Sequence, residues 1–298
     1  MIDPASALAA PTRTVTTSWN PDDVVRYHLA LGAGGCGELA DLRYVDEQQV
    51  RPLPTFSVVG AGDAATPLVY GDPLGLAPAR VLQRSQSLEM HRALPADAEQ
   101  YRHAARVESV WDGGTDATVV IRVDTTDDSG SPLCVNRFSL LVRGGGGFGG
   151  DPAPRATASD ASEPPFVVIE TRTLRQQALL YRACADRHRI HLDPAVAKAA
   201  GFERPLLQGL CTWGIACKQL VDHLLDGDSS VIGEFGARFA GPVYPGETLR
   251  ITAWSVDEGF RFAAEVVERE TPALRDGRLV LRQPVPSSER ARRDRSGR

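Results

Sequence analysis

The second half of the chain changes from helical spacing of apolar residues to the alternation that is typical of strands. Apolar side chains recur at helical spacing over residues 175–185, which end in a polar stretch. A short helix is predicted over 193–201, with Asp193 as its N-cap and Gly201 as its stop. A long, strongly apolar helix is predicted from Gly209 to about Asp226. Four strand-like runs follow, over 235–246, 247–256, 260–270 and 278–285.

The first half repeats this order of elements, although not the residue identities. A helical segment over 21–34 corresponds to the first helix of the second half, and LPTFSVVGAG (53–62) stands where the long helix begins. Four strand candidates follow, over 81–91, 101–111, 117–127 and 134–144. A strongly apolar helix must be buried on most sides, which a curling sheet provides. We therefore predict an α+β protein with a double hot-dog fold, in which two antiparallel sheets each wrap a long helix and pair within one chain.

A segment rich in glycine, proline, serine and alanine separates the two halves. This segment, RGGGGFGGDPAPRATASDASEPP, cannot bury enough apolar surface to offset the entropy lost on ordering. The predicted organisation is an N-terminal repeat (1–142), a linker (143–165), a C-terminal repeat (166–286) and a disordered basic tail (287–298). Only the second repeat has a histidine-containing loop after its first helix. We expect it to carry the chemistry and the first repeat to hold a substrate tail.

Composition and charge exclude several classes of partner. The 298 residues carry a formal net charge of -5, whereas general nucleic-acid binding needs a basic face. No stretch approaches the roughly 20 apolar residues of a membrane helix, and the N-terminus lacks the basic and apolar regions of a signal peptide. The five cysteines are scattered without zinc-like pairs, which favours reduced thiols. We expect a cytoplasmic protein with no nucleic-acid or membrane partner.

The polar loop of the second half contains three side chains that can do chemistry. Asp186, His188 and His191 fall within six residues. A carboxylate and an imidazole that reach the same water can deprotonate it and return a proton to carbon. Gly209 opens the long helix, so its N–H can stabilise a developing oxyanion at close approach. Two other interpretations stay open: a zinc or iron site formed by the three loop residues, and a solvated polar turn without chemistry.

The segment ALLYRACADRHRIHLDPAVAKAAGFERPLLQGLCTWGIA resembles the signature of the hydratase 2 family, the MaoC-like dehydratases. In that family a Tyr-Arg helix runs into Gly-Asp-x-Asn-Pro-(Leu/Ile)-His, then Asp-Pro, Ala-Gly-Phe and Arg-Pro-Ile-Leu-His-Gly-Leu-Cys-Thr. The segment ARFAGPVYPGETL (237–249) resembles a second family segment. A match of about forty residues without a change of spacing is far more specific than a short motif. The order of elements extends the resemblance to nearly the whole chain and is most similar to two-repeat actinobacterial members from fatty-acid and sterol side-chain oxidation.

The resemblance implies a role for each matching position. Asp186 and His191 stand at the family's catalytic aspartate and histidine, and Gly209 stands where a backbone N–H serves the thioester oxygen. The implied activity is reversible hydration of a trans-2-enoyl-CoA to the (R)-3-hydroxyacyl-CoA. The chain would then be a hydro-lyase without metal or redox cofactor, with coenzyme A as part of its acyl-CoA substrate.

Three neighbouring positions depart from the family pattern. His188 replaces an asparagine, Arg189 replaces a proline and Gln208 replaces a histidine. In one neutral tautomer His188 can position water as the asparagine would. Arg189, Gln208 and Arg238 are candidates for contact with substrate or coenzyme A.

These departures keep an alternative open, in which the chain is a non-catalytic acyl-thioester-binding protein or partner subunit of the same fold. Thioester hydrolysis on the same fold is a third hypothesis. Association of two chains into a homodimer also stays open, because the two halves can already pair within one chain.

Overall fold

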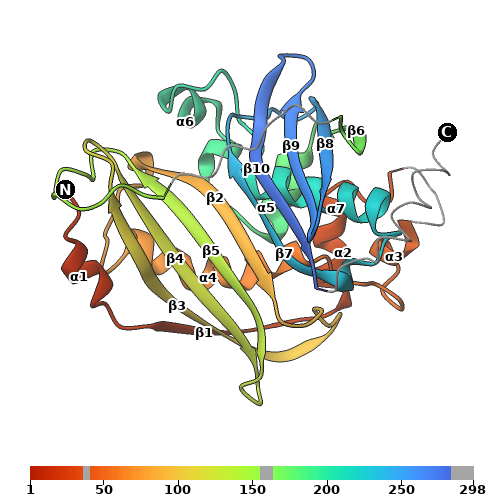
Figure 1. The fold of residues 1–298 in the computed structure, drawn as a ribbon, viewed down its shortest axis with the longest axis horizontal. Coiled ribbons are helices and arrows are strands. Elements are labelled where there is room, and N and C mark those ends of the chain that lie inside the picture. The colour runs from red at the N-terminus through yellow and green to blue at the C-terminus, as the bar shows by residue number, and fades with distance from the viewer. Residues whose placement is uncertain (36–40, 155–163, 283–298) are drawn as a thin grey trace.

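An antiparallel sheet of ten strands runs through both halves of the chain (Figure 1). It is seen in a computed structural model that describes residues 1–35, 41–154 and 164–282. The strand order is β1-β3-β4-β5-β2-β7-β10-β9-β8-β6. The strands of the first half are β1 (Arg13–Trp19), β2 (Val81–Met90), β3 (Ala98–Asp112), β4 (Ala117–Asp127) and β5 (Pro132–Val142). Those of the second half are β6 (Val167–Arg172), β7 (Ile232–Phe239), β8 (Thr248–Val256), β9 (Gly259–Val266) and β10 (Thr271–Leu281).

The strand order confirms the predicted internal repeat. Counted from the outer edge inward, the first half runs first, third, fourth, fifth and second strand, and the second half follows the same sequence. The halves meet where β2 pairs antiparallel with β7, so the two predicted sheets are hydrogen-bonded into one. The prediction of four strands per half was wrong, because the described part of each half contains five. The missing strands, β1 and β6, precede the helical segments predicted over 21–34 and 175–185. They lie at the sheet edges, where exposure weakens the apolar alternation.

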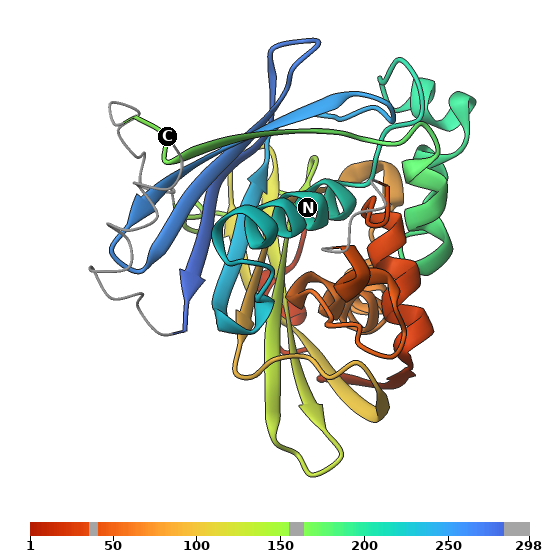
Figure 2. The same ribbon diagram turned by 90° about the vertical axis from the view of Figure 1, so that its right-hand side faces the viewer.

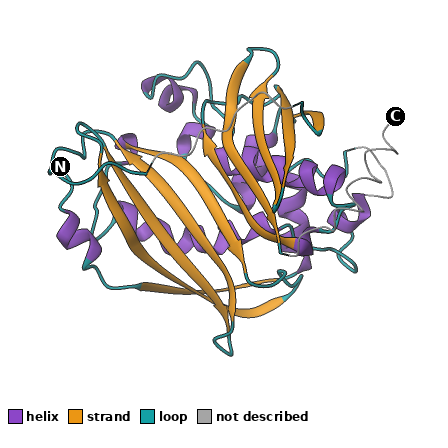
Figure 3. Cartoon of the chain, viewed as in Figure 1, coloured by secondary structure: helices purple, strands orange, loops and turns teal. Residues whose placement is uncertain are grey.

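The helices of eight or more residues lie together on one side of this sheet (Figures 2 and 3). The first half contains α1 (Pro4–Leu8), α2 (Pro21–Ala30), α3 (Leu42–Val45) and α4 (Val58–Tyr70). The second contains α5 (Gln177–Cys184), α6 (Pro194–Ala199) and α7 (Gly209–Leu224). Short 3-10 turns are η2 (Pro54–Ser57), η3 (Pro78–Arg80), η4 (Arg189–His191) and η5 (Ser229–Val231). No helix within the described ranges has the length and apolar character needed to span a membrane.

The helix α7 is the buried helix that the apolar pattern predicts. Its Trp213 ring lies 5.1 Å from the ring of Phe235 on β7, which stacks on Phe262 of β9. The corresponding helix α4 is shorter and contains Pro67, whose ring removes a backbone donor. Double hot-dog architecture is therefore confirmed, with a longer central helix in the second half.

A buried ion-pair cluster joins α7 to the first half. Lys218 is only 7% exposed, and its Nζ lies 2.9 Å from Asp222 Oδ2 and 3.2 Å from Asp41 Oδ1. The Tyr44 hydroxyl donates to Asp222 Oδ1 at 2.6 Å, and the ammonium lies 4.7 Å from the Tyr44 ring centroid. Because Asp41 and Tyr44 come from the first half, this cluster fixes the position of α7 against it.

The glycine-rich start of the predicted linker is anchored to the first half. The N–H groups of Gly114 and Gly147 donate to Asp112 Oδ1 at 2.8 and 2.9 Å, and that of Gly149 donates to Oδ2 at 2.7 Å. These hydrogen bonds, of which the one from Gly147 has the largest effect, lower the pKa of Asp112 to about 2. Residues 155–163 of the linker and 283–298, which include the predicted tail, lie outside the described residues.

Substitution of Asp112 by asparagine is expected to lower the melting temperature at neutral pH. A carboxyl group with a lowered folded-state pKa stabilises the fold above its ordinary pKa and loses this contribution as the pH falls through the lowered value. The difference between wild type and Asp112→Asn should therefore narrow as the pH is reduced from about 7 to about 3 in thermal melts. Asp128→Asn, at an exposed turn, is the control. An equal difference at both pH values would contradict this account of Asp112.

Candidate active site

The loop after α5 brings Asp186 and His191 together. The short turn η4 places His191 Nε2 at 3.4 Å from Asp186 Oδ2. The imidazole is 10% exposed and the carboxylate 40% exposed, so the pair opens to solvent on the carboxylate side. Burial acts to raise the pKa of Asp186. Hydrogen bonding and charge from His191, when that ring carries a proton on both nitrogens, together with the His188 N–H, lower the pKa below its ordinary value.

The hydrogen bond on the far side of the ring sets the tautomer of His191. His191 Nδ1 lies 2.8 Å from the Leu206 carbonyl oxygen. A carbonyl only accepts, so Nδ1 carries the proton and, in the neutral ring, Nε2 presents a lone pair toward Asp186. Two acceptors that face each other are satisfied by one water molecule donating a hydrogen to each. The geometry thus suits the activation of water.

His188 shapes this turn through its backbone and its ring. Its N–H donates to Asp186 Oδ1 at 2.8 Å, and its Nδ1 accepts from the Ile190 N–H at 3.2 Å. The ring proton is therefore on Nε2. Burial lowers the pKa of His188, with a raising effect from Asp186 and a further lowering one from His191. The ring centres of the two histidines lie 6.3 Å apart. The backbone N–H of His188 is the group that holds the Asp186 carboxylate in place.

Gln208 connects the turn to the start of α7. It is 1% exposed, and its Nε2 donates to the Ala178 carbonyl at 3.0 Å and to the Asp186 carbonyl at 3.4 Å. Its Oε1 has no hydrogen-bond partner among the described residues. The next residue is Gly209, the first of α7, where the N–H groups are free of intrahelical partners and the helix dipole is positive. The segment between the dyad and this amide therefore begins and ends at neighbouring points, because Gln208 bonds to the Asp186 carbonyl.

A ring from the sheet covers Gly209 closely. A Cβ atom built on Gly209 would lie 3.1 Å from both Cδ1 and Cε1 of Phe239. Packing thus favours glycine at this position, and glycine also gives a substrate carbonyl close access.

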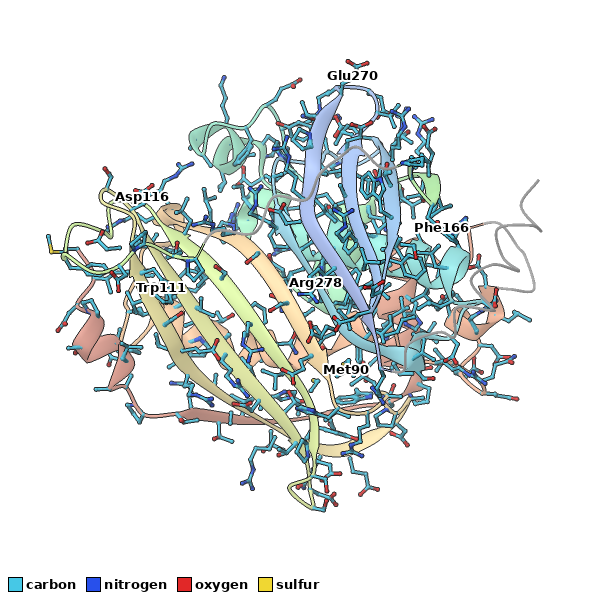
Figure 4. All side chains as sticks on the ribbon, in the orientation of Figure 1. Met90, Trp111, Asp116, Phe166, Glu270 and Arg278 are labelled. Carbon is cyan, nitrogen blue, oxygen red and sulfur yellow. The ribbon has the colours of Figure 1, made fainter. Side chains whose placement is uncertain are left out.

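Each of the two candidate arginines is paired with a carboxylate outside the dyad. Arg189 is 70% exposed and pairs with Asp193 at 2.5 Å. Arg238 pairs with Asp276 at 2.7 Å. Side chains alternate along a strand, so Arg238 points away from the face on which Phe239 meets Gly209. It shares that outer face with Arg278, which Figure 4 labels on the side of the sheet opposite the helices. The expectation that Arg238 contacts substrate finds no support in this placement.

The first half approaches the site through α4, which the sequence did not indicate. Burial and the negative charge of Asp186 both raise the pKa of Tyr70 at the end of α4. Burial raises the pKa of Asp63, while the charge of Arg187 opposes it. A cavity of about 210 Å³ lies between α4 and the strands of the first half, and Cys184 of α5 forms part of its wall. Only contact between distant segments creates this neighbourhood, so no local motif marks it.

The interpretation of the loop as a metal site is not supported by its geometry. In the part of the chain that the structure describes, no group of three histidine, cysteine, aspartate or glutamate side chains is arranged to hold a metal ion. One nitrogen of each loop histidine is already engaged with the backbone, by Leu206 O and by Ile190 N–H.

Comparison with known proteins places the chain in a family. Residues 157–275 match the MaoC like domain, and residues 18–144 match the MFE-2 hydratase 2 N-terminal domain. Enoyl-CoA hydratase ChsH3 of Mycobacterium tuberculosis is 38% identical, over 94% of this chain and 96% of its own. The crystal structure of a MaoC-like dehydratase from Phytophthora capsici superposes with a TM-score of 0.84 at 26% identity, over 95% of this chain and 98% of its own. The chain belongs to the MaoC-like dehydratase and hydratase 2 family.

Proposed function

We propose that the protein catalyses the reversible hydration of trans-2-enoyl-CoA to (R)-3-hydroxyacyl-CoA in fatty-acid or sterol side-chain metabolism. The observation that carries the proposal is the 3.4 Å pair of Asp186 Oδ2 and His191 Nε2, linked through Gln208 to the first amide of α7. The relatives named as enoyl-CoA hydratase and 3-hydroxyacyl-thioester dehydratase support the same reaction class, a hydro-lyase.

The chemistry can be assigned to these groups with atoms in balance. Water held between Asp186 and His191 attacks C3 of the enoyl group while one of its protons passes to the dyad. The electron pair of the C2=C3 bond shifts toward the thioester carbonyl, whose oxygen accepts from the Gly209 N–H. The dyad then returns a proton to C2, which completes the addition of one water. No net redox change occurs, so the proposal includes no redox cofactor, and coenzyme A takes part as the thioester group of the substrate.

The first half would hold the acyl tail in the cavity beside α4. Cys184 of the cavity wall lies two residues before Asp186, which places the cavity next to the dyad in the chain. A cytoplasmic location and assembly as a monomer or a homodimer belong to this proposal as well.

The test is to incubate purified protein with crotonyl-CoA and follow the enoyl-thioester absorbance and free thiol together. We expect loss of the absorbance without thiol release, and chiral analysis should give the (R)-3-hydroxy product. Thiol release would indicate hydrolysis. Saturable binding of acyl-CoA without turnover would instead support the non-catalytic alternative.

Replacement of Gly209 by alanine is expected to reduce kcat at least about tenfold, less than the roughly hundredfold to thousandfold loss when an oxyanion donor is removed, because the N–H is displaced rather than lost. The added methyl group would meet the Phe239 ring and displace the start of α7. Steady-state kinetics with crotonyl-CoA measures the loss. The double variant Gly209→Ala/Phe239→Leu removes the crowding and should recover part of the activity. Full activity of Gly209→Ala alone would contradict the expected displacement of this amide by the Phe239 ring.

A further inference from the structure

Buried polar side chains, as well as apolar ones, line the cavity of the first half. Its apolar wall includes Trp19, Phe56 and Leu133. The less exposed part of its polar wall includes Thr17, Ser57, His103 and Thr125. Polar groups in an interior cost free energy unless they are hydrogen-bonded, and a pocket that takes only a hydrocarbon tail has no use for them. The presence of these polar side chains in the cavity wall therefore suggests that the cavity binds more than a hydrocarbon.

The first polar group is a chain of three side chains across neighbouring strands. His103 on β3 is buried, with Nε2 2.8 Å from Thr17 Oγ1 and Nδ1 3.0 Å from Thr125 Oγ1. Gly60 of α4 packs directly on the ring, since a Cβ atom there would lie 2.5 Å from His103 Nε2. Glycine at this point lets α4 accommodate the imidazole at the cavity wall.

The hydrogen-bonded side chains of Thr17, His103 and Thr125 can present either a donor or an acceptor to the cavity. One ring nitrogen of neutral His103 donates and the other accepts. When His103 donates to Thr17, the threonine O–H is free to donate into the cavity. In the other tautomer Thr17 donates to the ring, and its lone pairs accept from the cavity. Burial lowers the pKa of His103 to about 4, which keeps the ring neutral at physiological pH.

A second buried chain ends at the same cavity. Gln86 Nε2 donates to Asn136 Oδ1 at 3.0 Å, and Asn136 Nδ2 donates to Ser57 Oγ at 3.1 Å. Gln86 and Asn136 are both buried. Since the Ser57 oxygen accepts from Asn136, its own proton can be donated either to the Cys134 sulfur, with which Ser57 also interacts, or into the cavity.

Neither of the two hydrogen-bonded chains contains a charged group. The more exposed lining residues include Asp23, Arg26 and Asp63, and Arg26 is paired with Asp23 at 2.8 Å. The charged part of the lining is therefore negative in sum, which disfavours an anionic tail.

We propose that this cavity is a binding site for an uncharged oxygen function, a hydroxyl or a carbonyl, on the tail of the acyl thioester. The proposal rests on the proposed function, in which the tail enters the first half. Thr17 would make the contact, with His103 and Thr125 setting its polarity and Ser57 as a second donor. The protein would then select acyl groups that are oxygenated far from the thioester.

The test compares trans-2-enoyl-CoAs of equal tail length that end in a methyl, a hydroxyl or a methyl ketone group, at several lengths. We expect kcat/KM of wild type to be higher for the oxygenated tails, by about two- to tenfold at the length that reaches Thr17, as for one net hydrogen bond. Thr17→Val should abolish or reverse this ratio, and Thr125→Val should reduce it. The ratio of kcat/KM values for two substrates, measured on one preparation, does not depend on the fraction of the protein that is folded.

Thr16→Val is the matched control, because Thr16 is the exposed neighbour on β1 and does not line the cavity. Its ratio should equal that of wild type. A wild-type preference for methyl tails at every length, or an unchanged ratio in Thr17→Val, would overturn the proposed subsite. Crotonyl-CoA has no tail, so failure of wild type to hydrate it would count against the proposed function, whereas hydration without tail preference would count only against the subsite.

Discussion

Asp186→Asn is expected to lower kcat/KM for enoyl-CoA hydration by about a hundredfold to ten-thousandfold, the usual contribution of a positioned acid or base. Asparagine retains an oxygen that can accept from the His188 N–H, now at 2.8 Å from Asp186 Oδ1, so the turn should keep its shape. It loses the negative charge and the basicity that water activation requires. The enoyl-thioester absorbance assay measures the loss, and a thermal melt checks that the fold is retained.

The control for this variant is Asp193→Asn in the same loop. Asp193 accepts from the Ala195 N–H at 2.9 Å as the cap of α6 and pairs with exposed Arg189, away from the dyad. Asparagine is also a good cap, so its activity should stay close to wild type. His191→Ala should resemble Asp186→Asn in size of effect, because the two residues act on one water. Near-normal turnover in both dyad variants would remove Asp186 and His191 from the mechanism.

Lys218→Met is expected to lower the free energy of unfolding by about 3–5 kcal/mol, the cost of removing one partner from a buried ion pair. The side chain of methionine fills similar volume, but Asp222 and Asp41 lose the ammonium that lies 2.9 and 3.2 Å from them. Chemical denaturation at neutral pH, with the slope compared between variants, measures the change.

Two further variants decide whether charge is the cause. Arg26→Met breaks a pair with Asp23 that is largely exposed, and should cost less than about 1 kcal/mol. Adding Asp41→Asn and Asp222→Asn to Lys218→Met removes the uncompensated charges and should restore part of the stability. No recovery in the triple variant would show that packing, rather than charge, accounts for the loss.

The repeat, the fold and the proximity of Asp186 to His191 could be predicted because they depend on local patterns. A helix period, an alternation and a forty-residue match are all contained in continuous segments. The site roles of Asp186, His188, His191, Gly209 and Gln208 stay predictions that the proposed experiments test.

What the sequence did not indicate depends on register or on contacts between distant segments. The face on which Arg238 lies is set by a one-residue choice of strand register, which also turns Phe239 toward Gly209. The polar chain from Thr17 through His103 joins residues 86 positions apart. The glycine-rich run has the composition of a free linker, and only the fold shows that its amides donate to Asp112.

The pairing of β2 with β7 has a consequence for how such a protein can be divided. Residues Ser85–Glu89 of β2 hydrogen-bond along β7, so either repeat expressed alone would carry an uncovered inner strand with unpaired amides and carbonyls. Separated repeats should recruit each other, or a copy of themselves, across that edge. A cut between the repeats is therefore compatible with a two-chain assembly that rebuilds the same sheet, whereas an isolated repeat is an aggregation hazard.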